Sequence, residues 1–153
     1  MKLDVQVRGK TVAQLYRERD EYVLRYLPDS LEADFVSLTM PVRDQPWRWP
    51  RDLHPFFRQN LPEGYLLDVI REEFGRYLDG TDLSLLAVVG GAGIGRVAVT
   101  PEGVAPGAEF EPFQVEQLLT AENTTERFGD LVRQYARAAI SGAVPKFLSP
   151  GAP

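Results

Sequence analysis

The chain contains no cysteine and a single histidine, His54, among its 153 residues. Without cysteine there is no disulfide framework and no thiolate zinc site, and one histidine cannot build a histidine-based catalytic metal centre. The sequence also lacks a run of 18 apolar residues and a charged N-terminal segment followed by an apolar one. We therefore expect that the chain has no membrane-spanning helix and is not secreted, and that it lies in the cytoplasm.

Positively and negatively charged residues are spread along the whole chain. The 17 Lys and Arg residues and 22 Asp and Glu residues give a formal charge of −5. Residues 1–50 carry 8 positive and 8 negative groups, residues 51–100 carry 5 and 7, and residues 101–153 carry 4 and 7. Because there is no basic stripe, we expect no direct binding to nucleic acid or to an anionic membrane.

The first 26 residues alternate between apolar and polar side chains. The apolar positions are Leu3, Val5, Val7, Val12, Leu15, Tyr22, Leu24 and Tyr26. A Gly9-Lys10 turn and the charged residues 17–21 interrupt this alternation, which predicts a small antiparallel meander. Further alternation over residues 35–40 predicts a fourth strand that ends at Pro41.

The middle of the chain combines an irregular segment with helical patterns. Three prolines among residues 45–55 predict an ordered loop or exposed arm without regular structure. Apolar residues at helical spacing predict a helix that begins at Pro62-Glu63 and runs to Tyr77, and a short apolar helix over residues 83–89. A strand is expected over residues 96–100. Together these elements predict an α+β fold, a small antiparallel sheet packed with several short helices.

The segment between Pro101 and Pro112 is rich in proline and glycine and is typical of a linker. We therefore predict a first module over residues 1–105 and a linker with a short helix over residues 106–122. Asn123 with Glu126 resembles a capping box, and apolar residues at helical intervals follow it, so a further helix is expected from residue 123.

Three groups of residues suggest chemistry, and each also has a purely structural interpretation. The glycines at 90–95 could bind a phosphate, but their spacing fits neither a dinucleotide fingerprint nor a P-loop, and we favour a helix cap and tight turn. His54 could be a general base, although a structural or surface histidine is the better interpretation. Trp47 and Trp49 could contact a partner, or one of them could cover the core, and the sequence does not choose.

Two separated motifs resemble a known family. The segment Pro55–Gly64, preceded by Ser37–Pro41 and followed by Leu83–Gly90 and a Gly-Arg-Val-Ala-Val strand, is similar to the N-terminal module of HipA-type serine/threonine kinase toxins. Residues 140–148 resemble the stretch with which that family opens its glycine-rich nucleotide loop. Two departures stand out: Val144 occupies a position where glutamine is common, and Gly91-Ala92 stand where many members have an aspartate.

The resemblance implies a non-catalytic module rather than an enzyme. A kinase needs a phosphate-binding lysine, a catalytic aspartate and Mg²⁺ ligands after its glycine-rich loop, and none can follow Pro153 in this chain. Residues 123–153 would then be a helix and the incomplete start of a kinase N-lobe, with Ser141, Gly142 and Lys146 in a partial nucleotide loop. The chain itself is expected to hold no cofactor and no metal, whereas a complete parent kinase would use ATP and Mg²⁺.

The resemblance also implies partners. The module is expected to bind a kinase body in cis or a separate HipA- or HipT-like kinase in trans, and it could also contact a HipB-like DNA-binding antitoxin. We expect the partner-binding residues to be Trp47, Trp49, Phe56, Phe57, Leu61 and Pro62. We favour a fragment of a longer kinase toxin. A free-standing HipS-like antitoxin, a nucleotide-binding enzyme domain and a subunit that only dimerises are the alternatives.

Overall fold

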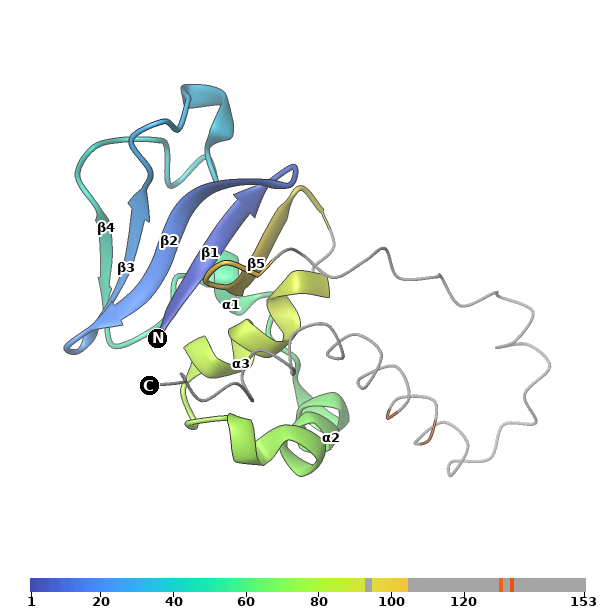
Figure 1. Cartoon of the computed structure of the whole chain (residues 1–153). Helices are drawn as coiled ribbons and strands as arrows, with labels where there is room; N and C mark the ends of the chain where they lie inside the picture. Colours follow the sequence, from blue (N-terminus) through green and yellow to red (C-terminus); the bar gives the residue numbers. More distant parts are fainter. Residues whose placement is uncertain (93–94, 105–129, 131–132, 134–153) are drawn as a thin grey trace, which may run out of the picture.

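The computed structural model describes residues 1–92, 95–104, 130 and 133, and its main feature is a five-stranded antiparallel sheet (Figure 1). The sheet order is β4-β3-β2-β1-β5. The strands are β1 Lys2–Val7, β2 Lys10–Glu18, β3 Glu21–Tyr26, β4 Trp47–Pro50 and β5 Val97–Pro101. The helices are α1 Pro55–Arg58, α2 Gly64–Phe74 and α3 Asp82–Val89, with 3-10 turns η1 Glu32–Asp34, η2 Gly75–Tyr77 and η3 Gly90–Ala92. The predicted α+β class is confirmed.

The predicted meander is formed by β1, β2 and β3. Arg8 and Gly9 both have positive φ angles, 53° and 81°, which is the backbone of the two-residue turn that matches the twist of an antiparallel hairpin. Leu3 pairs with Leu15, and Leu15 pairs with Leu24. The three leucines therefore lie side by side on one face, and all three are fully buried.

Helix α3 lies between two apolar clusters and joins them. Its residues from Leu83 to Val88 are all buried, as expected for a helix that is apolar on every side. Leu83 and Leu86 pack in the main cluster, beneath the sheet, together with Phe57 of α1. Leu85 packs in a second, smaller cluster with residues of α2. Helices α1 and α3 thus cover the apolar face of the sheet (Figure 1).

Both edges of the sheet are protected. The last turn of α3 and η3 pack against β5 so closely that a Cβ atom on Gly90 would lie 2.6 Å from the Val99 carbonyl oxygen. After β5 the chain folds back over the other face of the sheet, where the Gly103 N–H donates to Asp4 Oδ2 (2.8 Å). At the opposite edge, Pro46 precedes β4 and Pro50 is its last residue, and a proline offers no N–H to a further strand.

The prediction of a strand over residues 35–40 is wrong. This segment forms a tight turn in which Ser37 and Met40 make one isolated bridge. In a strand, Val36, Leu38 and Met40 would all point to the same face of the sheet. Here Val36 and Met40 are buried while Leu38 is 85% exposed, so the apolar alternation does not reflect a strand. The Tyr26 hydroxyl, from β3, bonds the backbone of Val36 and Met40 in place of a neighbouring strand.

The prediction that residues 45–55 contain no regular structure is also wrong. The segment holds the edge strand β4, and Pro55 is the first residue of α1. Proline is tolerated at both places because an edge strand has one unpaired side and the first turn of a helix needs no N–H partner. The helix predicted from Pro62 begins two residues later, at Gly64, and the helix and strand predicted around residues 83–89 and 96–100 are present.

The predicted module boundary near residue 105 remains a prediction. The predicted linker, the helix from residue 123 and the kinase-like segment lie almost entirely outside the described residues. Of this region the structure describes Asp130 and Arg133, which form an ion pair (3.4 Å). Arg133 also reaches Glu72 of α2 (4.0 Å).

Candidate partner-binding surface

Strand β4 places both tryptophans on the apolar side of the sheet. Trp47 pairs with Leu24 and Trp49 pairs with Tyr22, whose side chains belong to the main cluster. Alternation along a strand sends residues two apart to the same face, so both indoles lie over the edge of the core. Each is partly buried and partly exposed. The two interpretations of the tryptophans are therefore compatible, because each ring covers the core and keeps an accessible part.

The indoles belong to a continuous row of flat side chains, Arg43, Trp47, Trp49 and His54, here called the aromatic row. The Arg43 guanidinium lies 3.4 Å from the centroid of the Trp47 ring. The Trp47 and Trp49 rings are 6.5 Å apart and nearly parallel, at 9°, and the Trp49 and His54 rings are 4.7 Å apart. Trp47 Nε1 also donates to the Pro41 carbonyl (3.1 Å). These contacts hold the row in one arrangement before any partner binds.

Arg43 carries the positive charge of the aromatic row. Its guanidinium donates to the carbonyl oxygens of Gln45 (2.9 Å) and Pro46 (3.1 Å), so neutral groups fix its position and leave its charge uncompensated in these contacts. The side chain is exposed. Arg43 could not be assigned to this surface from the sequence, because it lies in an irregular segment, where residue spacing gives no information about neighbours. A cation beside two indoles is the residue combination that is enriched at binding hot spots.

His54 has a structural role in this arrangement. Its Nδ1 accepts a hydrogen bond from the Phe56 N–H (3.2 Å) and so caps the N-terminus of α1. Burial lowers the pKa of the imidazole below its usual value, because the charged form is poorly solvated there. Because Nδ1 already accepts a hydrogen bond from the backbone, it is not free to accept a proton from a substrate. This geometry favours the structural interpretation of His54 over a general base.

The other four expected contact residues differ in exposure. Phe57 is fully buried and packs edge-on against Phe56 (5.3 Å, 87°), so it supports the surface from within the core. Phe56 is partly buried, as are Leu61 and Pro62. Leu61 touches both apolar clusters. The structure therefore brings Phe56 and the tryptophans to the rim of one cluster, while Leu61 lies where the two clusters meet.

The outward edge of β4 has few unpaired N–H and C=O groups with which another strand could pair. The Arg51 N–H donates to the Asp20 carbonyl (2.9 Å), and by alternation Trp49 and Trp47 also direct their backbone groups toward β3. Arg48 is then the residue of β4 whose N–H and C=O both point outward, because Pro50 has no N–H. Its side chain is held by Glu18 (2.8 Å) and Glu21 (3.0 Å). The outward edge of β4 therefore has few backbone groups with which another strand could pair.

The glycine-rich segment gives no support for a phosphate site. Gly90 ends α3 and is buried against Val99, so its missing side chain serves close packing. Residues 93 and 94 lie outside the described residues, as do Ser141, Gly142 and Lys146 of the partial nucleotide loop. In the part of the chain that the structure describes, no group of three or more His, Cys, Asp or Glu side chains could hold a metal ion.

Comparison with known proteins identifies the family. A family model described as the HipA N-terminal domain matches residues 3–100, which contain β2, β3, β4 and the three helices and all but one residue of β1 and of β5. The chain belongs to the HipA N-terminal domain family. A search of curated proteins gave no significant match. The match confirms the resemblance to the HipA N-terminal module, whereas the resemblance of residues 140–148 to a nucleotide loop stays a prediction. The aromatic row lies wholly inside the matched residues.

A HipA N-terminal domain is a non-catalytic module. The pKa shifts of its titratable side chains have two kinds of cause, burial for Tyr22, Tyr26 and His54 and polar contacts for others. Lys10 and Asp34, for example, form an ion pair of 2.8 Å that raises the pKa of the lysine and lowers the pKa of the aspartate. Within residues 1–92 and 95–104, no helix is long and apolar enough to cross a membrane.

Proposed function

We propose that this HipA N-terminal domain is the interaction and regulatory module of a HipA-like serine/threonine kinase toxin in a type II toxin-antitoxin system. The observation that carries the proposal is the family match, which spans residues 3–100, from β1 into β5. In this proposal the kinase chemistry belongs to a catalytic body that binds ATP and Mg²⁺, and the module contributes binding surface. Ser141, Gly142 and Lys146 would begin the nucleotide loop of that body.

The aromatic row is the proposed contact surface for the kinase body. It presents two indole edges and one cation whose positions are fixed by stacking and by backbone carbonyls. A surface that is already ordered loses little conformational entropy on binding, and this favours affinity. Recognition through these side chains is favoured over an added strand, because Pro50 offers no N–H at the outward edge of β4 and the Arg48 side chain is held by Glu18 and Glu21.

The alternative is a free-standing HipS-like antitoxin that binds and inhibits a separate kinase. It uses the same surface, because the fold and the aromatic row are identical in both cases. The two functions differ in their effect on phosphorylation. An assembly module would leave kinase activity unchanged or raise it, whereas an antitoxin would lower it.

The test is titration of the chain into a HipA-like kinase core that lacks its own N-terminal module. We expect saturable binding by calorimetry. The phosphorylation rate is measured in parallel, and its direction of change distinguishes the two functions. Absence of both at tens of micromolar, a range that detects complexes with a binding free energy of about −7 kcal/mol or stronger, would remove the proposal.

Two matched charge reversals locate the contact. Arg43→Glu removes the cation of the aromatic row, and we expect it to weaken binding by about tenfold or more, as for a hot-spot arginine. Arg25→Glu makes the same change at an exposed arginine of β3, whose neighbours Leu24 and Tyr26 face the core, so its side chain lies on the other face of the sheet. Equal weakening by both variants would indicate a general charge effect and would contradict the proposed surface.

A further inference from the structure

Residues 102–104, called the strap here, directly follow β5 and turn back over the face of the sheet opposite to α1 and α3 (Figure 1). The Val104 N–H donates to the Pro101 carbonyl (2.9 Å), which closes the turn. Gly103 has a φ of 73°, a backbone conformation that favours glycine. The strap is the last part of the domain before residue 105.

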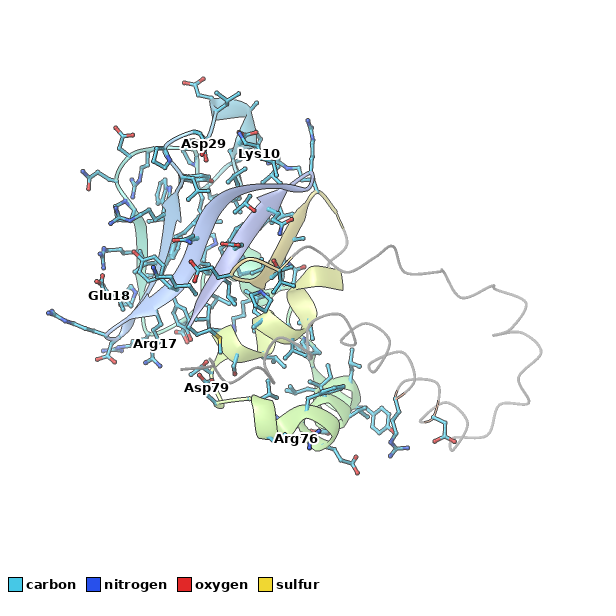
Figure 2. The ribbon with its side chains drawn as sticks, in the orientation of Figure 1. Lys10, Arg17, Glu18, Asp29, Arg76 and Asp79 are labelled. Atoms are coloured by element: carbon cyan, nitrogen blue, oxygen red, sulfur yellow. The ribbon has the colours of Figure 1, made fainter. Side chains whose placement is uncertain are left out.

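Three polar residues form one rung across the sheet beneath the strap. Asp4 of β1 pairs with Gln14 of β2 on one side and with Thr100 of β5 on the other. Figure 2 shows Lys10 and Glu18 at the two ends of β2, and Gln14 lies midway between them in the strand. The rung therefore crosses the middle of the sheet rather than one of its ends.

Two members of the rung are buried although they face away from the main apolar cluster. Their chain neighbours Leu3, Val5 and Val99 pack in that cluster. Alternation along a strand therefore directs Asp4 and Thr100 to the opposite face of the sheet. Asp4 is 9% exposed and Thr100 is 3% exposed. Polar side chains that are this deeply buried need hydrogen-bond partners, and the strap supplies them.

Each residue of the strap is bonded to a different strand. The Gln14 side-chain amide donates to Glu102 Oε1 (3.0 Å), and the Gly103 N–H donates to Asp4 Oδ2 (2.8 Å). The third bond runs from the Thr100 hydroxyl to the carbonyl of the last strap residue (2.7 Å). Polar groups from β2, β1 and β5 thus specify one closed position of the strap.

The closed strap also leaves one buried acceptor unpaired. Gln6 lies on the same face of β1 and is 4% exposed, and its Nε2 donates to Thr100 Oγ1 (3.2 Å) and to the Val104 carbonyl (3.3 Å). Its Oε1 is buried without a hydrogen-bond partner among the described residues. With the amide turned over, Oε1 would lie against the Val104 carbonyl oxygen, so neither orientation satisfies both atoms. An unpaired buried acceptor costs free energy and opposes the three bonds that favour closure.

We propose that the strap sets, while it is closed, where the rest of the chain leaves the sheet, and that it is poised to open. The family match ends at residue 100, and residues 105–153 follow the strap, so its position directs everything after the domain. This inference goes beyond the proposed function and needs no partner. In the proposed kinase toxin, the strap orients the module toward the catalytic body.

Amide hydrogen exchange of the whole 153-residue chain, followed by NMR, measures closure at the Gly103 N–H. Asp4→Ala removes its acceptor, and we expect exchange to become faster by about tenfold or more, as for a lost bond to a charged group. Asp4→Asn is the matched control, because it keeps an acceptor oxygen, and its increase should stay below about threefold. The Leu15 N–H of β2 reports on the fold and should exchange at the same rate in both variants.

Gln6→Met tests the force that opposes closure. It replaces the amide by an apolar side chain of similar length and removes the unpaired oxygen, while the Thr100 hydroxyl still donates to the strap. We expect the Gly103 N–H to exchange more slowly, by about threefold or more. Faster exchange would show that the Gln6 bonds hold the strap closed, and it would contradict a strap that is poised to open.

A distance measurement tests whether the strap directs the following chain. Since the protein has no cysteine, Arg25→Cys on β3 and Ala105→Cys after the strap can carry two spin labels without other changes. Pulsed electron paramagnetic resonance should give one narrow distance when the strap is intact and a broad distribution when Asp4→Ala is added. Gly103→Ala opens the strap without altering the sheet, because only its positive φ strains the new side chain, and it should broaden the distance likewise.

Two results overturn the inference. One is a Gly103 N–H that exchanges as fast in the wild-type chain as in an unfolded peptide, and the other is a distance distribution that neither Asp4→Ala nor Gly103→Ala changes. None of these measurements involves a kinase. A failure of the strap therefore leaves the proposed function standing, and a failure to bind a kinase core leaves the strap standing.

Discussion

At the scale of single residues, Gly90 shows how one position can satisfy two requirements. The sequence predicts it as the end of a helix, and the structure confirms that it is the C-terminal cap of α3. Its φ angle of −67° is open to any residue, so backbone freedom does not explain the glycine. The reason is the approach of β5, whose Val99 carbonyl occupies the space that a side chain would need.

Gly90→Ala is therefore expected to lower the free energy of unfolding by about 1–3 kcal/mol, the usual cost of an added methyl in a packed site. Urea denaturation monitored by tryptophan fluorescence measures this change. Gly75→Ala is the control, because no atom lies within 4 Å of its added Cβ and its φ is −53°. It should be neutral or stabilise by up to about 1 kcal/mol. Equal destabilisation by both variants would contradict the packing explanation.

His54 gives the fold a pH dependence of known sign. Burial holds its pKa in the folded state below the reference value of 6.5. A group with a depressed folded pKa contributes stability that is present above pH 6.5 and is lost as pH falls through the folded pKa. Protonation also removes the Nδ1 acceptor that caps α1, which acts in the same direction.

We expect the single histidine signal in a proton NMR titration to give a pKa below 6.5, and the stability measured in urea to decrease from pH 7.5 to pH 5. His54→Asn supplies a good helix cap that does not titrate, so its stability should lose the part of this dependence that comes from residue 54. A histidine pKa at or above 6.5 would show that the imidazole is not buried as described.

At the scale of elements, α3 depends on a short capping network. Thr81 Oγ1 accepts from the Ser84 N–H (3.3 Å) and donates to Asp79 Oδ1 (2.6 Å), and Asp79 Oδ1 also accepts from the Thr81 N–H (2.9 Å). These bonds fix where the helix starts. Since α3 contacts both apolar clusters, its position sets the packing of the sheet against α2.

Thr81→Ala is expected to lower the free energy of unfolding by about 1 kcal/mol through loss of the cap. Chemical denaturation followed by circular dichroism at 222 nm measures the change. Thr39→Ala serves for comparison, because Thr39 is an exposed residue outside any helix. Its effect should stay within about 0.5 kcal/mol. The cap would have no energetic role if the two variants unfolded at the same urea concentration.

Strand β4 illustrates why an element can be missed in the sequence. Prolines normally argue against a strand, and residues 45–55 contain three of them. The strand forms because pairing with β3 needs only the inward groups of Trp47 and Trp49. The opposite error occurs at residues 35–40, where apolar alternation predicts a strand but the Tyr26 hydroxyl takes the backbone bonds.

At the scale of the whole molecule, the two apolar clusters share α3 and Leu61 and should unfold together. Trp47 and Trp49 report on the sheet cluster by fluorescence, and the helical signal includes α2 of the smaller cluster. We expect the two urea transitions to coincide, which is the behaviour of one cooperative unit. A helical transition at lower urea than the fluorescence transition would show that α2 unfolds independently.

The candidate surface was only partly predictable. The sequence singled out Trp47 and Trp49, because tryptophans two apart in a proline-flanked segment are hard to bury together, and the family resemblance added Phe56 and Phe57. It could not assign Arg43 to the same surface, because the contact between its guanidinium and Trp47 depends on the path of an irregular loop. Nor could it separate buried Phe57 from partly exposed Phe56, since that difference depends on how the four residues of α1 meet the core.

The sequence alone determined the three-stranded meander, the positions of α2 and α3, the strand after the glycines, and the absence of cysteine and histidine metal chemistry. These features follow from local periodicity, turn residues and composition, which need no knowledge of distant contacts. Tertiary structure decided the edge strand β4, the aromatic row and the exposure of Leu38. Each of these depends on a partner from another strand, Tyr22 and Leu24 for the tryptophans and Tyr26 for the turn, and such pairings form only when the chain has folded.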